Sequence, residues 1–249
     1  MSAFADHFSA VAEGYAAFRP SYPASLFAAL ARMAPSTNVV WDCGCGTGQA
    51  SVALTAHFGH VHATDASASQ IAQAERHDRI AYHVALAELS GLPTASVALV
   101  TVAQALHWFD VNAFHAEVHR VLQPNGVIAE WTYTLLDVPT APAVADVVNE
   151  MDARLKSWWP PQRQHVDARY EDLAFPFERL DVGAFVMEAE WTAAQLAGYV
   201  ATWSAVTRFR SANSEDPMVE FWRALTVAWG RAERQVIRWP LVLRVGRVG

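Results

Sequence analysis

Three glycines and two acids in the first third of the chain have the spacing of a ligand-binding loop. Gly44, Gly46 and Gly48 lie in the stretch NVVWDCGCGTGQAS, with Asp42 directly before them. Glycines between a strand and a helix let a ligand approach the backbone closely, because no Cβ stands in the way. Asp65 ends the next apolar run, where an acid can hold both hydroxyls of a ribose. These residue types predict a nucleoside ligand held against the backbone.

The spacing of the glycines and the nearby acid distinguish between two nucleoside ligands. Dinucleotide enzymes use G-x-G-x-x-G and seat a pyrophosphate at a helix N-terminus, whereas this loop reads G-x-G-x-G. A carboxylate at Asp42 would repel a phosphate and would suit an ammonium group. S-adenosylmethionine carries an ammonium group and a ribose but no phosphate, so it fits the pattern better than NAD.

Apolar runs and chain breakers predict the elements that must position these residues. Buried strands are expected at 39–41, 60–64, 80–84, 97–102 and 127–133, with the glycine loop after the first. Helical patterns alternate with them at 24–34, 50–58, 67–75 and 114–122, and a further amphipathic helix is expected at 8–18. A turn at Pro124-Asn125-Gly126 precedes the fifth strand. This alternation predicts an α/β fold, with a parallel sheet and helices on both faces.

The second half of the chain is less regular. Residues 136–172 predict mixed helix and loop, and strands are expected at 183–191 and 236–245. Thr192 with Gln195 has the pattern of a capping box, opening a helix through Trp203, and Asp216-Pro217 is an N-cap and N1 pair. Because no linker is evident, we expect one domain over 1–249. Its core would be 36–135, with a helical insertion or lid at 136–182 and C-terminal strands and helices at 183–249.

The glycine loop and four later segments resemble one known family. VVWDCGCGTG is similar to the first motif of the class I S-adenosylmethionine-dependent methyltransferases, and Asp65 stands where their second-strand acid lies. AELSGLP from Ala87, SVALVTVAQALHWF from Ser96 and EVHRVLQPNG from Glu117 resemble their later motifs, although Asn125 replaces a glycine. FRPSYP, ALHWF and TWSAVTRF are similar to the type 11, trans-aconitate-methyltransferase-like branch. The resemblance implies a Rossmann-like, seven-stranded, mainly parallel sheet with the last strand inserted antiparallel.

The resemblance also implies a set of cofactor contacts. Arg19 would pair with the methionine carboxylate with Tyr15 beside it, although these two could instead be a surface Arg and a core Tyr. Asp65 could also cap the helix that begins at Ser67, and Glu88 could be an exposed residue without a ligand. The full set is Tyr15, Arg19, Asp42, Gly44, Cys45, Gly46, Gly48, Asp65, Ala66, Gln70, Ala87, Glu88, Leu89 and Gln104.

His107 is the candidate catalytic residue, because it follows the fourth strand, where the transferred methyl group should point. An imidazole there could take a proton from an acceptor, or it could simply line the pocket. Trp108, Phe109, Trp131 and Tyr133 would wall the pocket or belong to the core. Arg208, with Arg210, would receive an acidic substrate or face solvent. Cys43 and Cys45 are expected to be small loop fillers, and no further Cys completes a metal site.

Composition narrows the function classes. The net charge is −7, and the sequence has no basic cluster that would attract nucleic acid. With 53% hydrophobic residues the chain can bury a full core. The first residues carry acids and no basic n-region, and no apolar run is long enough to span a membrane. We therefore expect a cytoplasmic protein, either a monomer or a homodimer.

The expected function is methyl transfer from S-adenosylmethionine to a small molecule, with S-adenosylhomocysteine as the product. O-methylation of a carboxylate or hydroxyl is the first choice, on the strength of the branch resemblance. Three alternatives stay open: an RNA-modifying methyltransferase, a non-catalytic cofactor-binding module and an NAD-dependent oxidoreductase. Asp42 and the glycine spacing count against the last of these.

Overall fold

A computed structural model describes residues 20–249, which fall into two compact units. The sheet unit contains residues 22–133, 164–185 and 241–249, and the helical unit contains 134–163 and 186–240. The helix expected at 8–18, with Tyr15 and Arg19, lies outside the described residues. The expectation of a single domain with an insertion stays a prediction.

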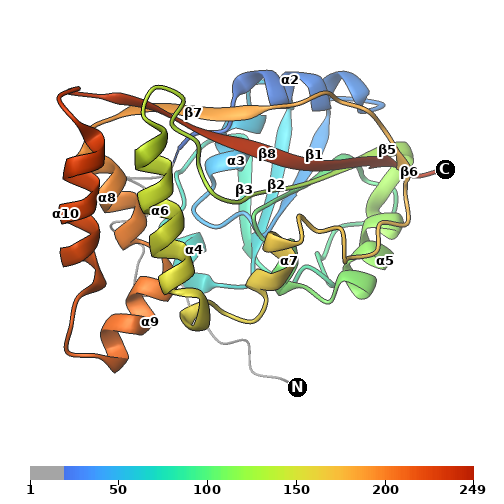
Figure 1. Cartoon of the computed structure of the whole chain (residues 1–249). Coiled ribbons are helices and arrows are strands. Elements are labelled where there is room, and N and C mark those ends of the chain that lie inside the picture. Colours follow the sequence, from blue (N-terminus) through green and yellow to red (C-terminus); the bar gives the residue numbers. More distant parts are fainter. Residues whose placement is uncertain (1–19) are drawn as a thin grey trace. The chain divides into compact units, whose positions relative to one another are not determined.

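The sheet unit is built on a mainly parallel sheet (Figure 1). Its strand order is β3-β2-β1-β4-β5-β8-β6, in which β1 to β5 run parallel and β8 runs antiparallel to β5. This confirms the expected fold class and the antiparallel last strand. Within the described residues the sheet has 8 strands rather than the expected seven, because β7 and the two-residue β6 both pair with β8. The strands are β1 (Val39–Cys43), β2 (His60–Asp65), β3 (Ile80–Val84), β4 (Val97–Ala103), β5 (Leu122–Tyr133), β6 (Glu178–Arg179), β7 (Val186–Trp191) and β8 (Gln235–Arg247).

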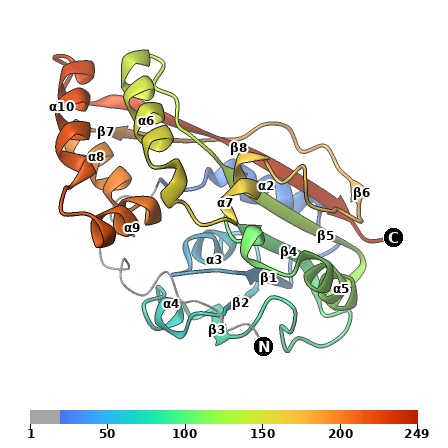
Figure 2. The ribbon, with the colours of Figure 1, turned by 60° about the horizontal axis from the view of Figure 1, so that its bottom comes forward.

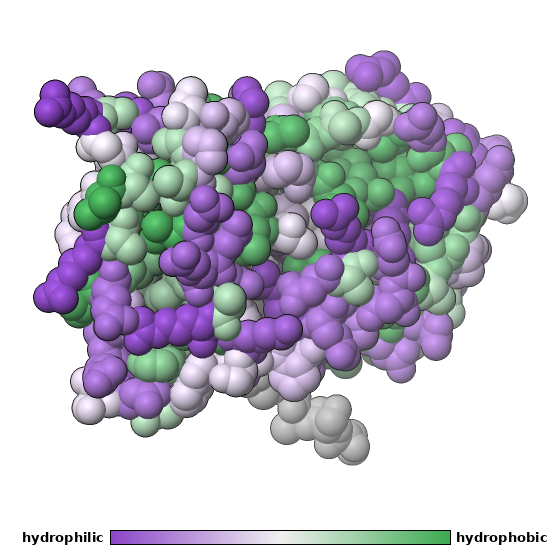
Figure 3. Space-filling view, viewed as in Figure 1, coloured by the Kyte–Doolittle hydropathy of each residue, from purple (hydrophilic) through white to green (hydrophobic). Residues whose placement is uncertain are grey.

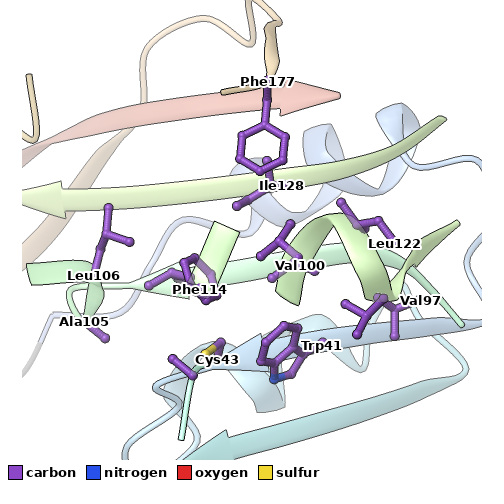
Figure 4. Packing of buried hydrophobic residues seen from close by; sticks show 14 of the residues in the cluster. Trp41, Cys43, Val97, Val100, Ala105, Leu106, Phe114, Leu122, Ile128 and Phe177 are labelled. Atoms are coloured by element: carbon purple, nitrogen blue, oxygen red, sulfur yellow. The ribbon is translucent and has the colours of Figure 1, made fainter. Parts of the chain in front are cut away.

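Helices cover both faces of this sheet. Alternate residues of each strand point to opposite faces, so each face has a core cluster of its own. One core cluster packs α2 (Ala24–Met33) and α3 (Gln49–Leu54) against residues such as Val40 and Leu99. The other packs α5 (Val111–Val121) and α7 (Arg163–Asp167) against Trp41 and Val100. Figure 2 shows α2 and α5 on opposite sides of the strands, and Figure 4 shows side chains of the second cluster. The five predicted core strands are all confirmed.

The Pro124-Asn125-Gly126 segment was expected to form a turn before the fifth strand. It lies within that strand instead, because β5 already begins at Leu122. Pairing with β4 shifts between Val97–Leu122 and Leu99–Val127, so the intervening residues bulge out of the ladder. Asn125 sits in this bulge with φ 62°, a conformation that Asn tolerates better than most residues. The turn residues were recognised correctly, but their place in a bulged strand was not.

The helical unit contains α6 (Pro142–Arg154), α8 (Ala193–Ala201), α9 (Ser204–Ala212) and α10 (Pro217–Trp229), and β7 pairs there with Gln235–Pro240. The capping box of Thr192 and Gln195 is present, and the side chain of Asp216 accepts a hydrogen bond from Met218 N. The helix expected to run through Trp203 ends at Ala201, and α9 follows it. The start of α9 has no side-chain cap from which it could have been predicted.

Among the described residues, the helices are all too short or too polar to cross a bilayer. Figure 3 shows hydrophilic residues spread over the face that it draws, with hydrophobic residues between them. The same part of the chain contains no group of three or more His, Cys, Asp or Glu side chains placed to hold a metal ion.

Candidate active site

The candidate site lies in the sheet unit, where the carboxyl ends of β1 to β4 meet. Ligands of open α/β sheets bind at this edge. The glycine loop leaves β1 and turns back on itself, with Cys45 N donating to Thr64 O at 3.0 Å and Gly48 N donating to Cys45 O at 2.9 Å. The loop is thereby tied to β2 before it enters α3.

The three glycines all have positive φ, but their surroundings differ. A Cβ on Gly44 (φ 67°) would lie 2.5 Å from Ala105 Cβ, and one on Gly48 (φ 92°) would lie 2.1 Å from Tyr82 Oη. Among the described residues, a Cβ on Gly46 (φ 56°) would meet only Gln70 Oε1, at 3.7 Å. The protein itself fills the space beside Gly44 and Gly48. Beside Gly46 the part of the chain that the structure describes leaves the backbone open, which suits a ligand that approaches it.

Asp65 links the glycine loop to the next helix. Its Oδ2 accepts from Gly46 N at 2.9 Å, and its Oδ1 accepts from Ser67 N at 2.8 Å. Ser67 is the N-cap of α4 (Ala68–Ala72), and Gln70 on that helix is buried beside Gly46. Asp65 therefore holds the residue before the helix, but the cap is Ser67 and not Asp65, so the alternative that Asp65 caps this helix is wrong. Ala66, between them in the sequence, is half-buried. A carboxylate oxygen can accept more than one hydrogen bond, so the contact with a ribose stays a prediction.

Asp42 is fully buried at the start of the loop. Its Oδ2 accepts from Ser51 Oγ at 2.5 Å and its Oδ1 accepts from Thr101 Oγ1 at 2.8 Å. Burial raises the pKa of Asp42 to about 6 and outweighs these two hydrogen bonds, which lower it. The carboxyl thus joins β1 to α3 and β4, a role that the sequence did not reveal. The contact with an ammonium group stays a prediction.

The segment after β3 is fastened at two points. Glu88 Oε1 accepts from Asp110 N at 2.9 Å, and Glu117 Oε1 accepts from Ser90 N at 2.9 Å and from Ser90 Oγ at 2.5 Å. Leu89, between the two anchored residues, is 71% exposed, and Ala87, just before them, is buried. The structure therefore holds the three residues expected to meet adenine at the same edge as the glycine loop.

The loop after β4 carries Gln104 and His107 and packs on the glycine loop. Gln104 has φ 54°, its Nε2 donates to Tyr133 O at 3.0 Å, and its Oε1 accepts from Thr132 Oγ1. His107 lies on η1 (Leu106–Trp108), with its Nδ1 3.0 Å from Tyr170 Oη. Tyr170 was missed, because it lies in the unpatterned stretch 136–172 and carries no motif. Tyr170 belongs to the candidate site because it contacts His107.

The expected pocket residues lie in different surroundings. Trp108 and Phe109 are partly exposed on the loop after β4. Trp131 is fully buried against Tyr22, with ring centroids 5.4 Å apart, and Tyr133 is buried too. Arg208 belongs to α9 of the helical unit, where Arg210 instead pairs with Asp216. Their roles toward a substrate stay predictions.

Cys43 and Cys45 are both free thiols, the first buried and the second partly so. Burial raises the pKa of both thiols, so neither forms a thiolate at neutral pH. Cys45 Sγ lies 3.6 Å from Gly46 O, and Cys43 packs in the core. Both residues act as loop and core fillers in this arrangement.

Comparison with known proteins identifies the family. Residues 41–129 match the family described as "Methyltransferase domain". A Dictyostelium discoideum protein named as a methyltransferase is 32% identical over 230 residues, covering 91% of this chain and 87% of the relative. A structure described as a type II methyltransferase from Anaeromyxobacter dehalogenans is 45% identical, with a TM-score of 0.86, covering 92% of this chain and 98% of the other.

A malonyl-[acyl-carrier protein] O-methyltransferase of Methylovorus is 33% identical over 114 residues, covering 40% of this chain and 37% of that relative. The narrower trans-aconitate-like resemblance stays a prediction. The open backbone at Gly46, the acid at Asp65 and full-length similarity to methyltransferases agree with one another. The chain belongs to the class I S-adenosylmethionine-dependent methyltransferases.

Proposed function

We propose that this enzyme methylates a small molecule at an oxygen, with a carboxylate or a hydroxyl as the acceptor group. The observation that carries the proposal is the open backbone at Gly46 beside the Asp65 carboxylate, with the loop of His107 packed directly on the glycine loop. That loop brings Ala105 and Phe109 to Gly44, so a cofactor at Gly46 and an acceptor near His107 would be neighbours.

The chain's own contribution is binding and alignment. S-adenosylmethionine supplies an already activated methyl group on its sulfonium, so the protein needs chiefly to orient the two reactants. Asp65 would accept the ribose hydroxyls, the backbone at Gly46 would face the cofactor, and Ala87 to Leu89 would contact adenine. Gln104, held by Tyr133 O, would complete the wall between cofactor and acceptor.

An oxygen acceptor is supported by two arguments of different kinds. The Methylovorus relative is named as an O-methyltransferase, although the chain spans only about a third of its length. His107 can act as a base for a hydroxyl acceptor, whereas a carboxylate acceptor needs none. Trp108 and Phe109 would wall the acceptor pocket.

Calorimetry with S-adenosylmethionine, S-adenosylhomocysteine and NADH on one preparation tests the proposal first. We expect both sulfur ligands to bind and NADH not to bind, after which small acids and alcohols are screened for methyl acceptance. If neither sulfur ligand binds, the assignment of the cofactor site is wrong. Methylation of RNA, with binding that falls steeply with salt, would overturn the small-molecule acceptor.

A further inference from the structure

A short turn after β3 is held in place by side chains of α5. Leu89 N donates to Leu86 O at 3.2 Å, which closes a turn with Ala87 and Glu88 at its corners. Both leucines are exposed, Leu86 at 53% and Leu89 at 71%. The turn and the residues that hold it all lie in the sheet unit. In the proposed function this turn would meet adenine, so the residues that hold it would affect cofactor binding.

The carboxylate of Glu117 on α5 is the main anchor of the turn. Its Oε1 accepts from Ser90 N at 2.9 Å and from Ser90 Oγ at 2.5 Å. Ser90 directly follows Leu89, and consecutive Cα atoms are about 3.8 Å apart. A displacement of Ser90 would therefore move the turn.

Arg120 completes the anchor from one turn further along the same helix. Its Nε donates to Glu117 Oε2 at 2.7 Å and its Nη2 donates to Glu117 Oε1 at 2.7 Å, a two-point contact that fixes the orientation of the carboxylate. Nη2 also donates to Leu92 O at 2.8 Å, and Leu92 N donates to Ser90 Oγ at 3.1 Å. The segment that leaves the turn is thus hydrogen-bonded to α5 through both Ser90 and Leu92.

Glu117 is only 7% exposed, and a buried carboxylate is costly unless it is paired and hydrogen-bonded. Hydrogen bonds from Arg120 hold its pKa at about 2, so the group is ionised at neutral pH. An apolar side chain of similar volume could pack on α5 without this cost. Besides Arg120, the partner of Glu117 within the described residues is Ser90, so what the carboxylate adds is a fixed position for the backbone behind the turn.

The start of the turn is anchored as well. Ala85 N donates to Asp65 O at 3.1 Å, which places the turn beside the residue expected to bind the ribose. Glu88 Oε1 accepts from Asp110 N, at the residue that caps α5. A base attached to a ribose at Asp65 would therefore have this turn as a neighbour.

We propose that Glu117, with Ser90 and Arg120, is a positioning residue for cofactor binding: it fixes the turn of residues 86–89 where the adenine ring is received, before the cofactor arrives. This inference rests on the proposed function, in which the turn meets adenine. A turn that is already fixed loses little conformational entropy on binding, so its fixation raises the affinity. Glu117 acts through Ser90 and needs no contact with the cofactor.

The test combines calorimetry with S-adenosylhomocysteine and amide hydrogen exchange without ligand, on the full chain. Glu117→Gln keeps the shape of the side chain but replaces one acceptor oxygen by an NH₂ group, which cannot accept from Arg120. The affinity is expected to fall by roughly fivefold to thirtyfold, the effect of having to order the backbone of one residue on binding. Exchange is expected to become faster at Leu89 N and Ser90 N, and to stay unchanged at Gly48 N in the glycine loop.

Two further variants separate positioning from a general loss of stability. Ser90→Ala removes the hydroxyl at the other end of the anchor, and it should weaken binding in the same direction even if Glu117→Gln folds poorly. Leu30→Ala is the control, because Leu30 is fully buried in the core cluster on the opposite face of the sheet; it should lower stability and leave the affinity unchanged.

Equal affinity in wild type and Glu117→Gln, or unchanged exchange in the turn, would overturn the proposal. It would also be wrong if exchange became faster in the glycine loop too, or if Leu30→Ala lowered the affinity as much, because Glu117 would then act only through overall stability. If the wild type itself does not bind S-adenosylhomocysteine, the proposed function fails together with this inference. If the wild type binds and the Glu117 and Ser90 variants bind equally well, this inference alone fails.

Discussion

At the scale of single residues, Gly46 allows the effect of a substitution on ligand affinity to be distinguished from its effect on backbone strain. Gly46 and Gly91 both have positive φ, and within residues 20–249 no atom comes closer than 3.7 Å to an added Cβ. Each Gly→Ala change should therefore cost a similar backbone strain, about 1–2 kcal/mol. Only Gly46→Ala should also reduce the affinity for S-adenosylhomocysteine, and Gly46→Val should abolish it.

Calorimetry and thermal melts on the two alanine variants separate these effects. Gly91→Ala serves as the control for strain, since Gly91 lies in the segment after β3 and no described residue comes within 4 Å of the added atom. Equal affinity in Gly46→Ala and wild type would show that the cofactor does not approach this backbone.

Asp65 is the second residue whose contacts can be tested singly. Asp65→Ala removes the proposed ribose acceptor and also the acceptor for Gly46 N and Ser67 N. We expect cofactor binding to weaken by roughly 1.5–3 kcal/mol, the scale for removing a hydrogen-bonded charge. Titration calorimetry measures this loss. Asp110→Ala is the matched control, because Asp110 is also an acid that accepts from a backbone N–H at a helix start, here Ala113 N, and unchanged affinity there would confine the effect to Asp65.

At the scale of elements, one buried ion pair joins α5, β5 and β8. Glu130 is 0% exposed and contacts His115 Nε2 at 2.6 Å and Arg244 Nη2 at 2.6 Å. Removing one partner of such a pair leaves a buried charge without compensation. Arg244→Met should therefore lower the free energy of unfolding by about 3–5 kcal/mol, as measured by urea titration.

Arg238 provides the comparison on the same strand. It pairs with Glu188 with about half of both side chains exposed, at 46% and 52%. An exposed pair contributes about 1 kcal/mol or less, so Arg238→Met should change stability little. Replacing Glu130 together with Arg244 by apolar residues should recover part of the loss. Equal effects at Arg238 and Arg244 would mean that burial of the pair does not matter.

The elements also show what the sequence could and could not predict. The apolar runs that became β1 to β5 were recognised because a buried parallel strand needs continuous β-branched and apolar residues. The capping box at Thr192 could also be predicted, because it depends only on two residues three positions apart in the sequence. In contrast, α9 has no side-chain cap, and β6 is too short to have a period.

Within the site, the glycine loop and Asp65 follow from local motifs, whereas the partners of His107 do not. Tyr170, in the turn after α7, reaches His107 across 63 positions of sequence. Contacts of this kind depend on how the sheet brings strand ends together, which no local pattern records. The structural role of Asp42 was hidden in the same way, because its partners are Ser51 and Thr101.

At the scale of the whole molecule, two buried carboxyls shape the dependence of stability on pH with opposite sign. The pKa of Asp42 rises from 3.8 to about 6, so folding favours its protonated form. The stabilisation is complete below pH 3.8 and is lost as pH rises through about 6. Glu117 behaves oppositely, because hydrogen bonds from Arg120 hold its pKa at about 2, below the usual 4.5. Its contribution is present above pH 4.5 and is lost as pH falls toward 2.

Asp42→Asn tests the first of these contributions. The wild type is expected to lose roughly 2–4 kcal/mol of stability as pH rises from about 4 to 7, and the variant should lack this slope. Urea titrations across that range measure it. A variant whose stability keeps the wild-type slope would show that the titrating group lies elsewhere.

The strand β8 has a consequence for how the chain is made. Its residues Leu241–Arg247 pair with β5, and the innermost pair, Tyr133 with Leu241, joins positions more than a hundred residues apart. During synthesis the edge of β5 therefore stays open for roughly 5–20 s after it leaves the ribosome, at ordinary rates of elongation. An unpaired strand edge invites pairing with other chains. The nascent protein should thus depend on a chaperone, or on slow release, until the closing strand has emerged.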